Sequence, residues 1–260
     1  MSVVEARAAT LRFGDRTLWS DLDLVVPAGE FLAVLGPNGA GKTSLLQVLL
    51  GLEPLTSGTV SVCGRPPRTG DPSIGYVPQQ KAFDRDMPIR GRDFVALGVD
   101  GHRFGWHRRG EAGEDRIRRA IDAVGASAFL DAPLGQLSGG EQQRLRIAQA
   151  LVGDPQLLLC DEPLLSLDLQ HQRAVSGLID LRRQRSGTAV IFVTHEVNPI
   201  LDVVDRVLYF VHGRWAIGTP DEVITSERLS DLYETDVEVI RSRGRLIIVG
   251  VPDTPEGAHH

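Results

Sequence analysis

Residues 36–43 constrain the fold of this chain more than any other segment. They read Gly-Pro-Asn-Gly-Ala-Gly-Lys-Thr and satisfy the pattern G-x-x-x-x-G-K-[ST]. The apolar run Phe31–Leu35 before them predicts a buried strand, and the apolar run 44–50 after them predicts a helix that Gly51 ends. A glycine-rich loop between a strand and a helix is the context in which this pattern cradles phosphate. We therefore predict a phosphate-binding loop here and not an ordinary glycine-rich turn.

Each residue type in this loop has its own expected role. Glycines let backbone N–H groups point into one concavity, and the N-terminus of the following helix adds positive potential. Lys42 is expected to reach the β- and γ-phosphates, and the hydroxyl of Thr43 is expected to ligate Mg²⁺. The residues expected to bind the triphosphate nucleotide are Gly36, Pro37, Asn38, Gly39, Ala40, Gly41, Lys42, Thr43 and Ser44.

Two carboxylates follow a second apolar run. Residues 157–160 predict a strand, and Asp161 and Glu162 stand at its end. Successive strand residues point in opposite directions, so the two acids can take separate roles. A phosphate-loop enzyme needs an Asp near the metal and a group that activates water. We predict that Asp161 holds Mg²⁺ and that Glu162 polarises the attacking water, although an isolated acidic pair after a strand more often just meets solvent.

The segment 137–144, Leu-Ser-Gly-Gly-Glu-Gln-Gln-Arg, carries the third signal. Ser138 is a good N-cap, and Glu141 three residues later would complete a capping box, so a helix is predicted to begin here. Gly139 and Gly140 would leave the positive end of that helix bare, which suits it to receive a γ-phosphate. With the phosphate loop, this segment resembles the signature sequence of ATP-binding cassette (ABC) ATPases, and the resemblance covers nearly the whole chain.

The resemblance implies further site residues from their order along the chain. Gln79 is similar to the glutamine that touches Mg²⁺ and the attacking water, and the adjacent Gln80 is a competing candidate. His195 is similar to the switch histidine that contacts the γ-phosphate, although a lone histidine at a strand end is more often structural. Asp168, in the segment 166–168, resembles the residue that crosses the dimer interface. Glu162, His195 and Gln79 thus form the expected catalytic set.

The resemblance also implies contacts with the base and the metal. Phe13 stands where the family places an aromatic ring that stacks on adenine, although it could equally belong to the core. The expected Mg²⁺ ligands are Thr43, Gln79 and Asp161. The signature residues expected to contact the ATP of another subunit are Leu137, Ser138, Gly139, Gly140 and Glu141.

The order of predicted elements favours an α/β fold. Short apolar runs alternate with helix-length stretches, as in a parallel sheet that is covered on both faces. The resemblance implies a P-loop NTPase, the ABC nucleotide-binding domain, with a RecA-like parallel-sheet core and an N-terminal antiparallel β subdomain. We expect this domain to span residues 1–226, with a helical signature subdomain inserted at about 81–153. Residues 227–260 are expected to form a small C-terminal extension.

The composition limits the classes of partner. A formal net charge of -6 supplies no basic surface for nucleic acid, so we expect no nucleic-acid partner. Cys63 and Cys160 stand far apart without metal-ligand spacing, and both are expected to be reduced packing residues. No apolar run approaches the roughly 18 residues that a membrane-spanning helix needs, so the chain is not expected to cross a membrane by itself.

The insert resembles, more specifically, the ATPases of bacterial zinc and manganese importers. The resemblance lies in residues 80–89, 93–98 and 105–109. It implies a subunit at the cytoplasmic face of the bacterial plasma membrane that drives metal import through a separate integral-membrane permease, with an extracytoplasmic substrate-binding protein. His102 and His107 are expected to face solvent or the permease and not to bind metal. A soluble assembly or regulatory factor and the ATPase subunit of an exporter remain open alternatives.

The resemblance also implies a homodimer. Two copies would close head to tail, with each ATP lying between Lys42 and Thr43 of one copy and residues 138–141 of the other. Because ATP would contact both copies only when they are closed, its binding would stabilise the closed state, and hydrolysis would reopen it.

Overall fold

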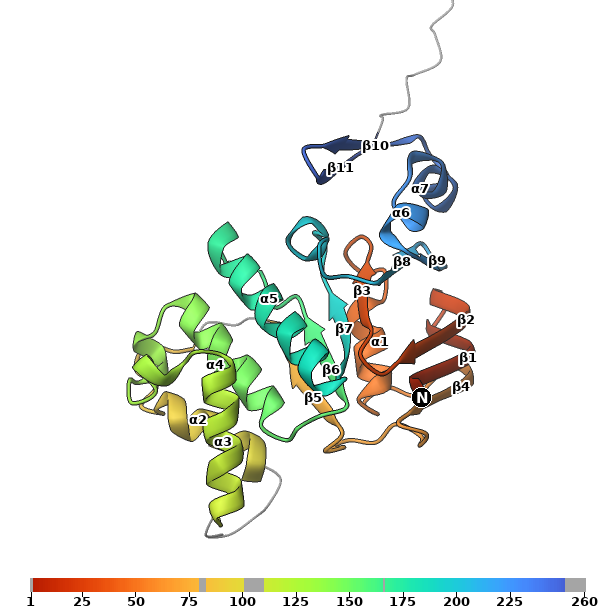
Figure 1. Ribbon diagram of the computed structural model, residues 1–260. Coiled ribbons are helices and arrows are strands. Elements are labelled where there is room, and N and C mark those ends of the chain that lie inside the picture. The colour runs from red at the N-terminus through yellow and green to blue at the C-terminus, as the bar shows by residue number, and fades with distance from the viewer. Residues whose placement is uncertain (1, 80–82, 101–109, 166, 251–260) are drawn as a thin grey trace, which may run out of the picture.

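A six-stranded sheet in the order β5-β6-β7-β3-β8-β9 forms the centre of the molecule (Figure 1). The computed structural model describes residues 2–79, 83–100, 110–165 and 167–250. The first five strands in this order are parallel, and β9 pairs antiparallel with β8. The strands of this sheet are β3 (Phe31–Leu35), β5 (Ile74–Val77), β6 (Leu157–Asp161), β7 (Ala189–Val193), β8 (Arg206–Val211) and β9 (Arg214–Gly218). The predicted parallel sheet is therefore confirmed.

Alternate residues of β3 enter two separate apolar clusters, one on each face of this sheet. Phe31, Ala33 and Leu35 belong to one cluster, and Leu32 and Val34 belong to the other. A strand that is buried on both faces needs apolar residues at every position. This explains the unbroken apolar runs of β3, β6 and β7.

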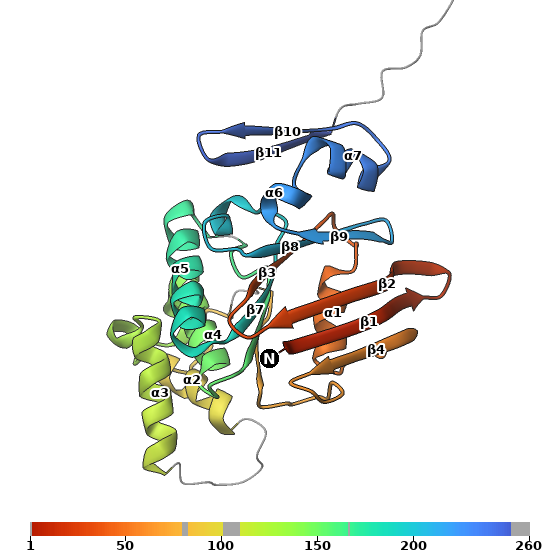
Figure 2. The same cartoon turned by 45° about the vertical axis from the view of Figure 1, so that its right-hand side comes forward.

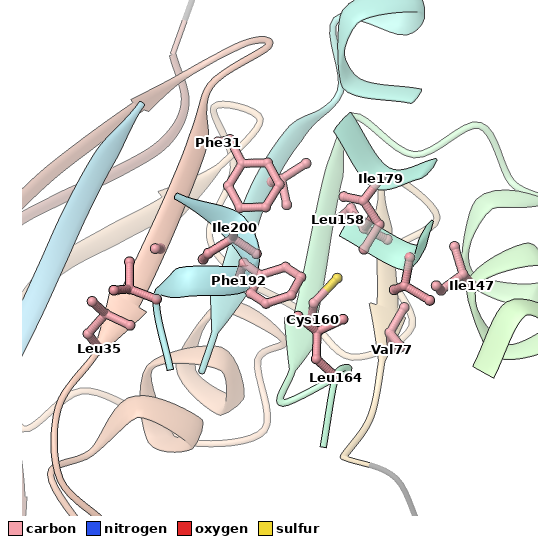
Figure 3. Packing of buried hydrophobic residues seen from close by; sticks show 14 of the residues in the cluster. Phe31, Leu35, Val77, Ile147, Leu158, Cys160, Leu164, Ile179, Phe192 and Ile200 are labelled. Atoms are coloured by element: carbon pink, nitrogen blue, oxygen red, sulfur yellow. The ribbon is translucent and has the colours of Figure 1, made fainter. Parts of the chain in front are cut away.

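The first cluster lies between the sheet and the helices α4 (Gly139–Leu151) and α5 (Leu169–Ser186). Figure 3 shows Phe31 and Phe192 close together, with ring centroids 5.4 Å apart, and Cys160 beside them. Both cysteines are free thiols, and burial raises the pKa of the Cys160 thiol far above its usual range. Cys160 is therefore the packing residue that the sequence predicts.

The second cluster joins the central sheet to an antiparallel sheet through helix α1 (Lys42–Leu49). This antiparallel sheet has the order β2-β1-β4 and lies beside α1 in Figure 2. Its strands are β1 (Ser2–Phe13), β2 (Arg16–Pro27) and β4 (Ser57–Val62). The expected antiparallel β portion is thus present, and it carries Phe13 at the end of β1.

Helices occupy most of the described part of the segment that was expected to be a helical insert. They are α2 (Gly91–Asp100), α3 (Glu111–Ala123), the 3-10 turns Ser127–Phe129 and Leu134–Gln136, and α4. On α3 the apolar residues Ile117, Ala120 and Ile121 are buried, and the arginines between them lie on the solvent side. No helix in the described ranges has both the length and the apolar character needed to cross a membrane.

The C-terminal part lies beyond β8 and β9 at one end of the molecule (Figures 1 and 2). It contains α6 (Pro220–Val223), α7 (Ser226–Tyr233) and a hairpin of β10 (Val237–Ser242) and β11 (Arg245–Gly250). The sequence predicts a small helix and a strand here, and the structure adds a second strand that pairs antiparallel with the first.

Candidate functional site

The loop between β3 and α1 has the backbone conformation that its glycines predict. Gly36, Gly39 and Gly41 have φ angles of 136°, 76° and 97°, a region that residues with a side chain rarely adopt. Within the described chain no side chain caps the N-terminus of α1, so the N–H groups of its first turn are available to a ligand. This arrangement fits a phosphate group.

Lys42 folds back over this loop. Its Nζ donates hydrogen bonds to the carbonyl oxygens of Gly36 at 2.7 Å and Pro37 at 3.0 Å, and the residue is only 5% exposed. Burial lowers the pKa of the ammonium group, and the nearby carboxylates of Glu162 and Asp161 partly offset that shift. A buried cation on the rim of an N–H-lined loop attracts an anion such as a polyphosphate.

Replacing Gly36 with alanine should lower the free energy of unfolding of the chain and distort this loop. A Cβ at Gly36 would lie 2.1 Å from the carbonyl oxygen of Phe210, and the φ of 136° is itself unfavourable for alanine. We expect a loss of about 3 kcal/mol in the free energy of unfolding, measured by urea denaturation. Gly64→Ala is the control, because Gly64 has a φ of 74° but no atom within 4 Å of its added Cβ. Equal losses in the two variants would contradict the expected clash.

Thr43 and Asp161 meet across two elements at the end of β6. The Thr43 hydroxyl donates to Oδ1 of Asp161 at 3.2 Å, and Asp161 is 3% exposed. Burial raises the pKa of this carboxyl, whereas the hydrogen bond from Thr43 acts in the opposite direction. A hydroxyl and a carboxylate are oxygen donors of the type that Mg²⁺ takes in phosphate sites, so the donor set fits the ion. The structure thus places two of the three residues predicted to ligate Mg²⁺ next to each other.

Glu162 follows the last residue of β6 and has an unusual backbone conformation. Its φ is 45°, which costs roughly 1 kcal/mol for a residue with a side chain, and its N–H donates to the carbonyl of Val193 at 2.9 Å. Its Oε2 lies 3.1 Å from Nδ1 of His195. The structure thus brings together two of the residues predicted to be catalytic, from the ends of neighbouring strands.

A pocket of about 600 Å³ is lined by Glu162, His195 and part of the phosphate loop. It is lined by Gly36, Pro37, Asn38, Gln79, Glu162, Leu165, His195, Tyr209, Tyr233 and Ile248. Gln79 is therefore in the same pocket as Glu162 and His195. Sequence reasoning missed Tyr209, Tyr233 and Ile248, which belong to β8, α7 and β11 and carry no motif. The alternative candidate Gln80 lies outside the described residues, as do His102, His107 and Ser166.

Phe13 lies at the turn between β1 and β2 and not in the core. Its side chain is 46% exposed, which rules out the alternative of a core residue and leaves the ring free to stack. Arg16, at the start of β2, donates from Nη2 to the carbonyl of Gly39 at 2.8 Å. Sequence reasoning also missed this contact, which ties the turn carrying Phe13 to the phosphate loop.

The signature segment begins α4 as predicted. Oε2 of Glu141 accepts hydrogen bonds from the N–H of Ser138 at 2.8 Å and its hydroxyl at 2.7 Å, and Ser138 Oγ accepts from the N–H of Glu141. The ring of His171 packs against Gly140, where an added Cβ would lie 2.5 Å from it. The N-terminus of α4 is therefore partly covered, although its first two residues are glycines. None of the described residues 137–141 lines the pocket above.

Asp168 caps the helix that carries His171. Its Oδ1 accepts from the backbone N–H of His171 at 2.9 Å, and its Oδ2 lies 2.8 Å from Nδ1 of the same residue. These hydrogen bonds lower the pKa of the Asp168 carboxyl. Through His171, Asp168 is thus linked to the N-terminus of the signature helix at Gly140.

Comparison with protein families and curated proteins gives one consistent result. A family model described as "ABC transporter" matches residues 19–165. The chain is 39% identical to the zinc transport system ATP-binding protein TroB of Treponema pallidum, over 88% of this chain and 86% of that protein. It is 36% identical to the zinc import ATP-binding protein ZnuC of Halorhodospira halophila, over 89% of this chain and 83% of the relative.

Solved structures support the same fold. The chain resembles one described as a metal-chelate type ABC transporter in an inward-facing conformation, with a TM-score of 0.82 and 25% identity. That match covers 97% of this chain and 99% of the other. A second match, to CbiO1 of Clostridium perfringens, has a TM-score of 0.75 and 24% identity and covers 88% of this chain and 93% of that one. At that identity the second match supports the fold alone.

Proposed function

The chain belongs to the ABC transporter family, and we propose that it is the ATPase subunit that drives import of a zinc or manganese ion through a separate membrane permease. The observation that carries this proposal is one pocket that is lined both by the phosphate-loop residues 36–38 and by Gln79, Glu162 and His195. Lys42 is hydrogen-bonded to two of those loop residues, Gly36 and Pro37. The 36–39% identity to zinc import ATP-binding proteins over most of their length supports the cargo class.

Within one subunit the residues divide into two groups. The loop of residues 36–44 holds the triphosphate, and Lys42 supplies the positive charge nearest the terminal phosphates. Thr43, Asp161 and Gln79 would hold Mg²⁺, which would neutralise charge on the phosphates. Phe13 stacks on the adenine ring.

The second group acts on the water molecule. Glu162 accepts a hydrogen bond, and then a proton, from the attacking water. Nδ1 of His195 lies 3.1 Å from Oε2 of Glu162, and in the doubly protonated imidazole the other ring nitrogen donates to the γ-phosphate. Glu162 has a positive φ, and its side chain lines the pocket. Catalysis in this scheme depends on positioning and on charge, as in other phosphoryl transfers.

Two copies of the chain complete the site. The signature residues 137–141 lie outside the pocket of their own subunit, which supports a contact with the nucleotide of a twin subunit. In a head-to-tail homodimer, the N-terminus of α4 would face that γ-phosphate, and Asp168 would lie at the interface. The division into a domain of residues 1–226, an insert at about 81–153 and an extension of residues 227–260 belongs to the same proposal.

The transport role follows from the relatives. Importer ATPases work with membrane permeases, so the subunit would sit at the cytoplasmic face of the bacterial plasma membrane and receive cargo through a permease and an extracytoplasmic binding protein. The relatives named as zinc transport or zinc import proteins favour this role over an assembly factor or an exporter.

A pull-down tests the transport role. We expect tagged Glu162→Gln protein, held with MgATP, to retain a multi-span permease from detergent-solubilised membranes of its host, identified by mass spectrometry. The control is the same protein without nucleotide, which should retain less because the closed dimer does not form. Uptake of radioactive zinc and manganese by cells with and without the gene then identifies the cargo. Recovery of soluble partners alone, from protein that still binds ATP, would favour the assembly factor.

A further inference from the structure

The C-terminal hairpin forms part of the wall of the catalytic pocket. Ile248 on β11 lines the pocket together with Glu162 and His195. Tyr233, the last residue of α7, lines it too, and its hydroxyl lies 3.2 Å from that of Tyr209 on β8. In Figures 1 and 2 the hairpin, which is the last described part of the chain, lies next to α7 at the end of the molecule. The extension therefore reaches the residues assigned to hydrolysis.

One side chain fastens the hairpin to the segment that follows His195. Nδ2 of Asn198 donates to the carbonyl of Leu246 at 2.9 Å, and Oδ1 of Asn198 accepts from the N–H of Leu246 at 2.8 Å. Asn198 begins the 3-10 turn Asn198–Ile200, and the Leu246 side chain is buried in the main core cluster. This two-point contact fixes both the distance and the orientation of the loop that carries His195.

The hairpin needs such contacts, because an isolated two-stranded sheet is only marginally stable in water. Further hydrogen bonds hold it on α7. The N–H of Val239 donates to Ser226 Oγ at 2.8 Å, and the N–H of Val237 donates to Ser230 Oγ at 2.8 Å. These hydrogen bonds fix the hairpin on α7, so it can restrict the movement of the His195 loop that it contacts.

The two faces of the hairpin have different surroundings. Val239 pairs with Ile248, so both lie on the inner face, whereas Ile240 pairs with Ile247 on the outer face. Val239 packs against the main core cluster and Ile248 lines the pocket. Ile248 is 39% exposed and Ile247 is 48% exposed. These neighbours are the same residue type with similar exposure, and only Ile248 faces the site.

We propose that Asn198 and the inner face of the hairpin are positioning residues that hold His195 against Glu162 for hydrolysis. The proposal rests on the hydrolytic function proposed for this pocket. ATP in its ground state is held by the phosphate loop of residues 36–44, which does not belong to the hairpin or to the His195 loop. Loosening the His195 loop therefore reduces the turnover of bound ATP far more than its affinity, because His195 contacts only the γ-phosphate whereas residues 36–44 hold the whole triphosphate.

The first test is Asn198→Ala in the full-length chain. We expect kcat for ATP to fall about tenfold, which is below the roughly hundredfold loss that a misplacement of 1 Å can cause. KM for ATP and the affinity for a fluorescent ATP analogue stay close to the wild-type values. Hydrogen exchange at the Leu246 amide becomes faster, because its acceptor is gone. An unchanged kcat, or a rise in KM equal to the fall in kcat, overturns the proposal.

The second test compares Ile248→Ala with Ile247→Ala and does not depend on how well Asn198→Ala folds. Both side chains are partly exposed, so both variants should melt close to the wild type. We expect kcat to fall about threefold in Ile248→Ala alone, with KM unchanged. Equal kcat values in the two variants overturn the proposal. The ATPase rate of Glu162→Gln gives the background of the assay. A wild-type rate no higher than that background would contradict the proposed function and not this inference alone.

Discussion

Replacing Glu162 with glutamine should reduce ATP turnover at least about a hundredfold while the protein still binds ATP, because a positioned general base contributes roughly 10²- to 10⁴-fold. Glutamine has nearly the same shape as glutamate and can still contact Nδ1 of His195, but it accepts no proton from water. The residues that hold the nucleotide, above all Lys42 and Thr43, are unchanged. The variant should therefore separate binding from chemistry.

Two measurements check this result. Phosphate release in a single turnover reports the chemical step, and fluorescence of a labelled ATP analogue reports binding. Glu196→Gln is the matched control, because Glu196 is exposed one residue beyond His195 and its backbone N–H, not its carboxylate, bonds to Thr194. We expect the control to turn over ATP at the wild-type rate. Normal turnover in Glu162→Gln would show that another group activates the water.

Replacing Lys42 with methionine should weaken ATP binding by roughly 2 to 3 kcal/mol, which corresponds to about a 30- to 150-fold rise in Kd. The Lys42 ammonium is the buried cation of the phosphate loop, and methionine keeps most of its length without the charge. Burial lowers the pKa of Lys42, which means that the charged form is disfavoured in the empty protein. The free energy of unfolding of the empty variant should therefore stay close to that of the wild type.

The change in melting temperature on adding ATP measures this effect directly, because a ligand stabilises only the state that binds it. The wild type should melt at a higher temperature with ATP, and Lys42→Met should lose most of that increase. Thr43→Ala provides the contrast. When ATP is added together with EDTA, Thr43→Ala should show the same rise in melting temperature as the wild type. The hydroxyl that this variant lacks is proposed to bind the metal, which EDTA removes from both proteins. A full ATP-dependent increase in Lys42→Met would exclude a direct role of Lys42 in binding.

The local motifs of the site could be predicted because each is contiguous in the sequence. Glycines at 36, 39 and 41 permit positive φ angles wherever they stand, and the loop has those angles. Ser138 and Glu141 form their capping box within one helical turn. The apolar run Phe31–Leu35 before the glycine-rich loop predicts a buried strand, and alternate residues of this strand enter the two core clusters. These features depend on neighbours in sequence, so no knowledge of the fold is needed to find them.

Contacts between distant segments could not be predicted in the same way. The sequence suggests roles for Glu162 and His195, but their 3.1 Å contact exists because β6 and β7 are adjacent, and Glu162 makes it from a backbone with positive φ. The sequence gives no sign of that φ, which is unusual for glutamate. The order of the central sheet, in which β3 lies between β7 and β8, is equally invisible in the order of the chain.

The sequence by itself determined the chemistry that is available: a phosphate loop with Lys42 and Thr43, two acids after a strand and a capped signature helix. Only the tertiary structure decided which other residues surround that chemistry. Asn198 and Ile248 carry no motif, and they matter because packing of the C-terminal hairpin places β11 beside the His195 loop. Local conformation depends on a few neighbouring residues, whereas the wall of a pocket depends on how all the buried apolar faces of the chain pack together.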